Sequence, residues 1–515
     1  VRKLVCDDED EQALTAAERH KFLEVSKGFI RFTHENLQVF FLQRLEREID
    51  GTAAAERLLA TEGIIVDREQ LGRLEMVAGR PQEAFSYLEP LWQHGSSWTN
   101  ISSLDISANQ LPNFHPLILA AEALGKPAGS IARLCVAETY CALHNASLAV
   151  ALRIAQGQYA QLNRLVLSSD EREDSLLLLK QLEAHILLNL GHIPSAKKIM
   201  EEIVTQAAMT RRIAENHRLM FDVFDRLQNI YHQLNHKAQF VNFSELSRHE
   251  AEAMSDEKLL SLVKSSRAKE YSFDAPDNFL VLTEQATEWS RHHASQRHRC
   301  HAELNLCIAR MMATPTDHTC IRAQIEMLSS LLSDAVRNAY SFSIARAELA
   351  LATAHALLGL DNEENRRGAE RYARLAIESC LRFGNGFLFW QLHNLLAIVE
   401  LHQDDASLDR SFGHWQTALH YLDQQGLLFL GNMDSCSPNL AVISNLIRFI
   451  YENETDLGVK EVAQRLRSYD SGQLKPAEWF QVVLQSVMKY GLIGRVEPLP
   501  IPFREPASNY LLALR

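Results

Sequence analysis

The sequence predicts an all-α protein, built as a right-handed solenoid of degenerate helical hairpins. Only 14 prolines and 21 glycines interrupt its 515 residues, and the strict apolar–polar alternation of half-buried strands is scarce. Apolar residues recur at helical spacing instead, as in residues 176–190 (LLLLKQLEAHILLNL). A third observation is self-similarity at a period near 45 residues, which is typical of helical-hairpin arrays.

Breaks in composition predict four parts along the chain. Residues 94–116 are rich in Ser, Asn and Pro and predict a long loop, residues 270–278 (EYSFDAPDN) predict a second joint, and residues 495–506 carry four prolines and predict an extended strap. We therefore expect an N-terminal arm or cap, hairpins with a loop insertion, repeats of 45-residue period, and a C-terminal cap with a Pro-rich tail, at 1–62, 63–270, 271–458 and 459–515.

The N-terminal part contains a strand-like FIRF segment followed by an amphipathic helix. Phe29, Arg31, Phe32 and His34 resemble the end of the winged-helix arm in STAND NTPases, where an aromatic, a basic and an aromatic residue precede a His and a helix. In that family a helical-repeat sensor follows, as it does here. An alternative interpretation is that Phe29–Phe41 forms only the first capping hairpin of the solenoid.

The STAND resemblance has consequences for cofactors and partners. It implies that an ATPase module, holding ATP and Mg²⁺, and an effector precede Val1. It also implies that the repeats bind a protein ligand and that activation proceeds through homo-oligomerisation by other domains. Bacterial members of the family include antiviral proteins that recognise phage proteins, as well as transcription activators.

Two hairpins in the second part resemble tetratricopeptide repeats. Gly79 and Gly191 occupy the turns, a small residue (Gly72 or Ala184) lies seven positions before each, and an alanine lies five positions after each (84 and 196). The Trp and Pro of the consensus are missing, and the period exceeds the family's value of about 34 residues. We expect degenerate, lengthened repeats over residues 64–430.

The third part carries the 45-residue repeat. Segments beginning at residues 301 (HAELNLCIARM), 346 (RAELALATAHA) and 391 (QLHNLLAIVEL) align a leucine followed by a small residue, namely Leu306–Cys307, Leu351–Ala352 and Leu396–Ala397. A large apolar residue beside a small one allows a neighbouring helix to pack closely. Leu440–Ala441 continues the series with a one-residue shift, and Leu332 and Ile377 match at the same interval.

The last part has the cadence of a winged helix over residues 459–505. Its candidate recognition helix, residues 477–490, offers only Lys489 beside Glu478, whereas DNA phosphates require a basic face. A terminal cap is therefore the favoured interpretation. A repeat-containing transcription regulator remains an alternative.

Composition excludes several classes of protein. Lys plus Arg number 52 against 65 Asp plus Glu, a net charge of −13, which disfavours nucleic acid and anionic membranes as partners. No apolar run approaches the roughly 18 residues of a membrane span, and no signal peptide is visible. The eight cysteines are scattered and form no C-x-x-C, which predicts reduced thiols in a cytoplasmic protein.

Motifs for chemistry are missing from the sequence. It has no G-x-x-x-x-G-K-[ST], no G-x-G-x-x-G, no H-E-x-x-H and no G-x-S-x-G, so we expect no catalytic residue and no cofactor within this chain. The best metal candidate is a His- and Cys-dense region, comprising His292, His293, His298, Cys300, His301, Cys307, His318 and Cys320. Most of these residues fall along one predicted helix, so we expect no metal there.

The remaining candidate is a binding surface. In helical-hairpin solenoids a concave face usually binds the partner, and the repeat register assigns to it the polar residues Glu69, Arg73, Gln181, His185, His301, Arg346 and Gln391. Aromatic residues offer alternative contacts at Trp98, Phe114, Trp289 and Trp390. The sequence thus predicts the protein-binding sensor of a STAND NTPase, with a stand-alone scaffold or a transcription regulator as alternatives.

Overall fold

The computed structural model describes most of the middle of the chain. The described residues are 23–26, 29–32, 56, 59, 68–93, 114–145, 147–234, 236–269, 276–294, 296–338, 340–403 and 408–427. Contacts divide the chain into two compact units, and the border between Leu179 and Lys180 falls within helix α11 (Ser169–Leu190). Each unit is described by itself below.

The two short strands lie at the N-terminal end of the described residues. β1 (Leu23–Ser26) pairs antiparallel with β2 (Phe29–Phe32), with Leu23 opposite Phe32 and Ser26 opposite Phe29. The FIRF segment is therefore a strand, as predicted. The amphipathic helix expected after it lies outside the described residues.

The first unit continues as a series of helices, each packed on the next. Its described helices are α5 (Arg68–Val77), α6 (Pro81–Gln93), α8 (His115–Ala123), α9 (Ala128–Asn145) and α10 (Leu148–Arg164). The α5–α6 turn contains Gly79 at φ +74°, a left-handed conformation that favours glycine. Gly72 lies directly against the Leu88 side chain, and Ala84 is fully buried, so small residues stand where these paired helices cross.

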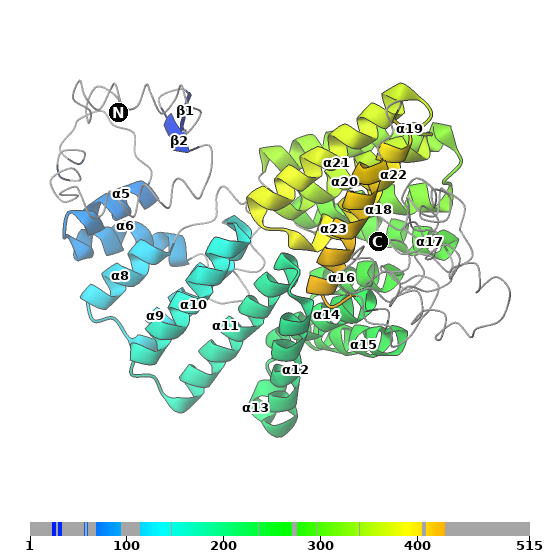
Figure 1. The fold of residues 1–515 in the computed structure, drawn as a ribbon. Coiled ribbons are helices and arrows are strands. Elements are labelled where there is room, and N and C mark those ends of the chain that lie inside the picture. Colours follow the sequence, from blue (N-terminus) through cyan, green and yellow to red (C-terminus); the bar gives the residue numbers. More distant parts are fainter. Residues whose placement is uncertain are drawn as a thin grey trace, which may run out of the picture. The chain divides into compact units, whose positions relative to one another are not determined.

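The second unit is a run of helical hairpins (Figure 1). From α14 onward each described helix packs on the next one along the chain. The hairpins are α11 with α12 (Ile193–Met209), α14 (His217–Gln233) with α15 (Lys237–Ala253), α16 (Glu257–Ala268) with α17 (Pro276–His293), α18 (Gln296–Ala313) with α19 (His318–Arg337), α20 (Ser341–Leu357) with α21 (Glu363–Phe383), and α22 (Phe389–Leu401) with α23 (Leu408–Gln424). Short α13 (Arg211–Ala214) and η3 (Gly386–Leu388) connect hairpins. The fold is an all-α solenoid.

Local capping sets where several of these helices begin and end. Asn216 precedes α14 and accepts a hydrogen bond from Leu219 N, while Asp317 caps α19 and Asn362 caps α21 in the same way. Such side chains satisfy the first free N–H groups of a helix. At the other end of α21, Gly384 takes the left-handed conformation at φ 83°, which closes the helix before η3.

The predicted large–small pairs form the helix contacts. Leu306, Leu351 and Leu396, together with the small residues that follow them, are all at most 3% exposed. Leu332 and Ile377 pack against the same core while remaining half-buried. The prediction that these large–small pairs pack against neighbouring helices is thus confirmed. Leu440 and Ala441 lie outside the described residues.

The expected joints and caps are described only in part. Residues 94–113 lie outside the described residues, and α8 begins directly after Phe114. The second joint is shorter than predicted because α17 begins at Pro276, and proline suits the first turn of a helix. Residues 459–515, with the winged-helix-like cap and the Pro-rich tail, lie outside the described residues.

Within the second unit the first and last described hairpins touch each other. An added Cβ at Gly386 would overlap the carbonyl oxygen of Leu190, in the α11–α12 turn. Gln425, after α23, lies against Gly191 of the same turn and donates from Nε2 to the Gly386 carbonyl at 2.9 Å. The series of hairpins therefore returns to its own beginning.

Candidate ligand-binding face

The structure places the predicted binding residues in both units. The backbone of Glu69 and the exposed Arg73 belong to α5, in the first unit. The other five belong to the second unit, on the first helices of four hairpins: Gln181 and His185 on α11, His301 on α18, Arg346 on α20 and Gln391 on α22. These five residues thus lie on first helices, whereas their role in binding stays a prediction.

Side chains on successive first helices of the second unit meet each other. Directly after α16, Lys269 donates from Nζ to Asn229 Oδ1 of α14 at 2.8 Å. Asn305 of α18 donates from Nδ2 to Ser265 Oγ of α16 at 3.4 Å. Both bonds join residues that are 40 positions apart, so one side of each of these first helices faces the next first helix.

The same side continues from α18 to α20. The His301 ring lies 6.2 Å from the Phe342 ring, measured between centroids, and Arg346 follows Phe342 by one helical turn. We call the surface on which these first helices meet the inner face. Its residues are Asp225, Arg226, Asn229, Ser265, Lys269, Arg297, His298, His301, Asn305, Phe342 and Arg346, together with His185.

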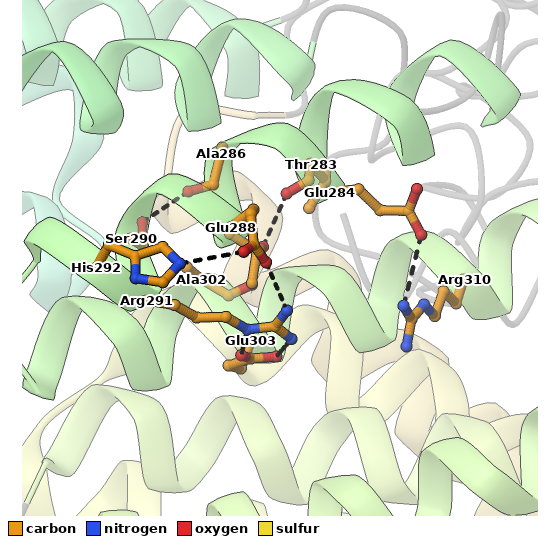
Figure 2. Close-up of polar contacts among 11 residues, drawn as sticks. Thr283, Glu284, Ala286, Glu288, Ser290, Arg291, His292, Ala302, Glu303 and Arg310 are labelled. Carbon is orange, nitrogen blue, oxygen red and sulfur yellow. Dashed lines mark hydrogen bonds and ion pairs between the residues drawn. The ribbon is translucent and has the colours of Figure 1, made fainter.

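On the side of α18 that carries Glu303, positive side chains have carboxylate partners (Figure 2). There, Arg291 of α17 holds Glu303 through two hydrogen bonds of 2.6 and 3.1 Å, and it also pairs with Glu288 at 2.9 Å. Farther along the two helices, Arg310 pairs with Glu284 at 3.4 Å. The charges drawn between α17 and α18 are therefore matched in opposite-sign pairs.

The inner face carries mainly positive side chains. Its cations are Arg226, Lys269, Arg297 and Arg346. Asp225 supplies a negative charge, which Arg226 holds at 3.0 Å and Gln228 Nε2 holds at 2.7 Å. The side chain of Arg346 is half-buried and forms no ion pair with a described residue.

The imidazoles of this face are kept neutral by their surroundings. Burial lowers the pKa of His185 well below its usual range, and the neighbouring cations Arg226 and Arg297 lower it further. Burial likewise lowers the pKa of His301 well below its usual range, and Arg346 and Lys269 are the next largest causes. At neutral pH both rings therefore offer neutral N–H and N groups for hydrogen bonds.

The charged form of the cations is itself disfavoured by the surroundings. The pKa of Lys269 is lowered to about 8. Burial is the largest cause and Arg346 the second, while Asp225 opposes the shift. Burial also lowers the pKa of Arg346, although a guanidinium stays charged at neutral pH. Half-buried positive groups in mutual proximity make this face a candidate binding site.

Several buried amide oxygens along the described first helices have no hydrogen-bond partner in the protein. Among the described residues, no hydrogen-bond partner is found for four side-chain oxygen atoms, nor for Arg226 Nε. The four atoms are Gln181 Oε1, Gln228 Oε1, Asn305 Oδ1 and Gln391 Oε1. Buried polar groups are normally hydrogen-bonded. Water or a ligand would satisfy these atoms.

Sequence reasoning assigned only His185, His301 and Arg346 to this face and missed its other nine residues, including Arg226 and Lys269. The reason is the spacing of the first helices from α11 onward, which begin at residues 169, 217, 257, 296, 341 and 389, so their intervals range from 39 to 48 residues. A fixed 45-residue register does not reach α14 and α16. Counting first and second helices from one turn to the next could have found these residues.

The structure also places several of the metal-ligand and aromatic candidates that the sequence offered. Burial raises the thiol pKa of Cys300 to about 11 and that of Cys307 to about 12. No group of three or more His, Cys, Asp or Glu in the described part of the chain is arranged to hold a metal ion. Phe114, offered as an exposed loop aromatic, is only 3% exposed at the start of α8, and Trp390 is fully buried. Trp98 lies outside the described residues, and Trp289 is half-buried.

Comparison with known proteins adds little to this description. No protein-family model matches the chain, and no curated protein matches it. Among solved structures, a "circular tandem repeat protein with novel repeat topology and enhanced subunit contact surfaces" is similar over 94% of each chain, at 13% identity and a TM-score of 0.20. At that score the two backbones do not superpose, and no conclusion about function follows. No described helix has the length and apolarity needed to cross a membrane.

Proposed function

We propose that this chain is a protein-binding helical-repeat region that recognises its ligand on the inner face. Stacked helical hairpins are typical of protein-interaction scaffolds, which bind partners on extended concave surfaces. The observation that carries the proposal is the gathering of half-buried cations, neutral imidazoles and unsatisfied amides on consecutive first helices. Catalysis has no part in the proposal.

The more specific form of the proposal is a sensor of the STAND type. It is supported by the aromatic–basic–aromatic–His motif of Phe29, Arg31, Phe32 and His34 ahead of the repeats, and by the strand that carries its first part. In this form an N-terminal module binds ATP and Mg²⁺ and stays inactive until a protein ligand, such as a phage protein, occupies the inner face. Ligand binding would supply the free-energy difference between inactive and oligomerising states.

A pull-down from bacterial cells, with and without phage infection, tests the proposal. The chain serves as bait in three forms: the natural sequence, Arg346→Glu on the inner face, and Arg322→Glu on the exposed side of α19. Both substitutions reverse one positive charge, so they differ only in location. Circular dichroism checks that each variant is folded, and mass spectrometry identifies what each captures.

Near-stoichiometric capture of one viral protein, lost in Arg346→Glu and kept in Arg322→Glu, is the expected result. Capture of host proteins alone, unchanged by infection but still dependent on Arg346, would contradict the phage ligand and leave an interaction scaffold. Capture that survives Arg346→Glu would contradict the inner face as the binding surface.

A further inference from the structure

We propose that the inner face binds an acidic polypeptide segment, whose carboxylates pair with Lys269 and Arg346 from separate hairpins. This inference rests on the proposed function, since it names the chemistry of the protein ligand. Its support comes from charge distribution, from the cost of burying charge, and from the spacing of helices.

Cations on the inner face differ in their partners from the cations between α17 and α18. The protein carries a net charge of −13, and between α17 and α18 the cations Arg291 and Arg310 have carboxylate partners (Figure 2). On the inner face, the hydrogen bond of Lys269 goes to the neutral amide of Asn229. Arg346 has no ion-pair partner among the described residues. Arg226 is paired with Asp225 at 3.0 Å, so Lys269 and Arg346 are the inner-face cations for which no described carboxylate lies within ion-pair distance.

Half-buried cations on the inner face cost the fold desolvation energy and repulsion. Taking a cation out of water is costly unless an anion pairs with it, and neighbouring cations such as Lys269 and Arg346 also repel each other. Nothing in the folding of α16 or α20 requires a charge at positions 269 and 346, because a long apolar side chain would fill the same space. A ligand carboxylate would offset the desolvation and the repulsion at once, and would form charge-assisted hydrogen bonds.

The distance between neighbouring first helices suits an extended peptide. Packed helices lie about 8–10 Å apart, and an extended chain advances about 3.3 Å per residue. An extended peptide of the polyproline II type, with three residues per turn, would therefore bring about every third residue to a new helix, with these side chains pointing the same way. The amide groups of Asn229 and Asn305 lie on the same face and suit the polar backbone of such a peptide.

A nucleic acid is the less favoured anion. Its phosphates repeat along the whole strand, and the field of a chain with net charge −13 would repel the portions that extend beyond the inner face. A short acidic segment, by contrast, confines its charge to the cations that it contacts.

Fluorescence anisotropy with three labelled probes tests the inference on the full chain. The first is a twelve-residue peptide with Glu at every third position among Ser and Gly, the second has Gln in place of Glu, and the third is a twelve-nucleotide oligo-dT. Each is titrated with the natural sequence, with the inner-face variant Lys269→Gln/Arg346→Gln, and with the matched variant Lys198→Gln/Arg322→Gln. Lys198 and Arg322 are exposed on second helices α12 and α19.

The expected result is that the Glu peptide binds at least tenfold more tightly than the Gln peptide. The inner-face variant should weaken this binding at least tenfold, whereas the matched variant should change it less than twofold. Weakening of the affinity with rising salt should be retained by the matched variant and reduced in the inner-face variant.

Four outcomes would overturn the inference. Equal binding of the Glu and Gln peptides would show that carboxylates are not recognised, and equal weakening by both variants would show non-specific attraction. Tighter binding of oligo-dT, lost in the inner-face variant, would assign the face to phosphates. If the pull-down partner is captured equally by the natural sequence and by Lys269→Gln/Arg346→Gln, the acidic ligand is excluded, while the proposed protein-binding function stands.

Discussion

Lys269 is a half-buried cation whose place in the fold lowers stability. Its ammonium group donates to Asn229 but loses solvation, and burial lowers its pKa from 10.5 to about 8. Because the folded-state pKa lies below the unfolded-state value, the folded chain holds fewer protons than the unfolded chain between these two pH values. The free energy of unfolding therefore rises with pH from about 8 to 10.5, and the destabilisation is fully present below pH 8.

We predict that Lys269→Met stabilises the second unit. The expected gain at pH 7 is about 1–3 kcal/mol, less than the full value of the pKa shift because the side chain is partly solvated. Urea unfolding followed by circular dichroism at pH 7 and pH 10 measures the gain and its decline at higher pH. Lys264→Met, at an exposed position of α16, serves as the control and should change stability by less than about 0.5 kcal/mol. A loss of stability in Lys269→Met would contradict the burial argument.

A second titratable pair lies between α22 and α23. The Nδ1 atoms of His393 and His414 are 3.0 Å apart, and burial, with His414 as the second cause, lowers the pKa of His393 from 6.5 to about 4. Burial also lowers the pKa of His414. Two protonated rings at this distance would repel each other, so the pair stays neutral at neutral pH.

The sign of the resulting pH dependence follows from the lowered pKa. Between pH 6.5 and about 4 the folded chain holds fewer protons than the unfolded chain, so the free energy of unfolding falls as the pH is lowered through this range. We predict that His393→Gln reduces this acid loss by about 1–3 kcal/mol at pH 4. Thermal unfolding at pH 7 and pH 4 provides the measurement, and His420→Gln, exposed on α23, should retain the acid loss of the natural sequence.

At the scale of the element, each hairpin depends on the repeated pair of a large and a small residue. Ala352 is fully buried beside Leu351 on α20, and both belong to one core cluster that also contains Ala369, Ala373 and Ala376 of α21. Alanines at the crossing let two helices approach closely, so the leucine fills the space that remains between neighbouring hairpins.

We predict that Leu351→Ala destabilises the second unit by about 2–5 kcal/mol, because close-packed helices cannot collapse into the cavity. Leu381→Ala on α21 is the matched control, since that leucine is 66% exposed and its truncation should cost less than about 0.5 kcal/mol. Chemical denaturation of both variants under one set of conditions compares them directly. Similar losses in the two variants would contradict the assignment of Leu351 to the core.

At the scale of the whole second unit, the contact between its first and last described hairpins is the feature with the widest consequences. The absence of a side chain at Gly386 allows η3 to lie against the Leu190 carbonyl, and Pro194 lies against Gly426 nearby. Because this contact joins segments about 200 residues apart along the chain, it couples the stability of hairpins that share no sequence neighbours.

We predict that Gly386→Ala destabilises the second unit by about 1–3 kcal/mol, since the added methyl overlaps backbone that cannot move aside easily. Gly413→Ala is the control. Gly413 lies within α23, and a methyl group added there would meet no atom within 4 Å, so alanine should stabilise that helix by roughly 0.5–1 kcal/mol. Hydrogen exchange should show faster exchange at the α11–α12 turn in Gly386→Ala alone. Unchanged exchange there would contradict the contact.

Much of the fold could be predicted because its determinants are local. Helical spacing of apolar residues, the turn glycines Gly79 and Gly191, and the pairs Leu351–Ala352 and Leu396–Ala397 act within one hairpin or between neighbours. A hairpin buries its apolar side against the next hairpin along the chain, so a pattern read from adjacent segments is sufficient to predict an all-α solenoid.

The charge of the inner face and the return of the last hairpin to the first were decided only by tertiary structure. Lys269 and Arg346 act on each other from separate hairpins, and Gly386 meets Leu190 across nearly the whole second unit. The physical reason is that the first helices begin at unequal intervals of 39 to 48 residues. The sequence spacing of residues that face each other therefore differs from one hairpin to the next. Only the packed structure determines which side chains lie together.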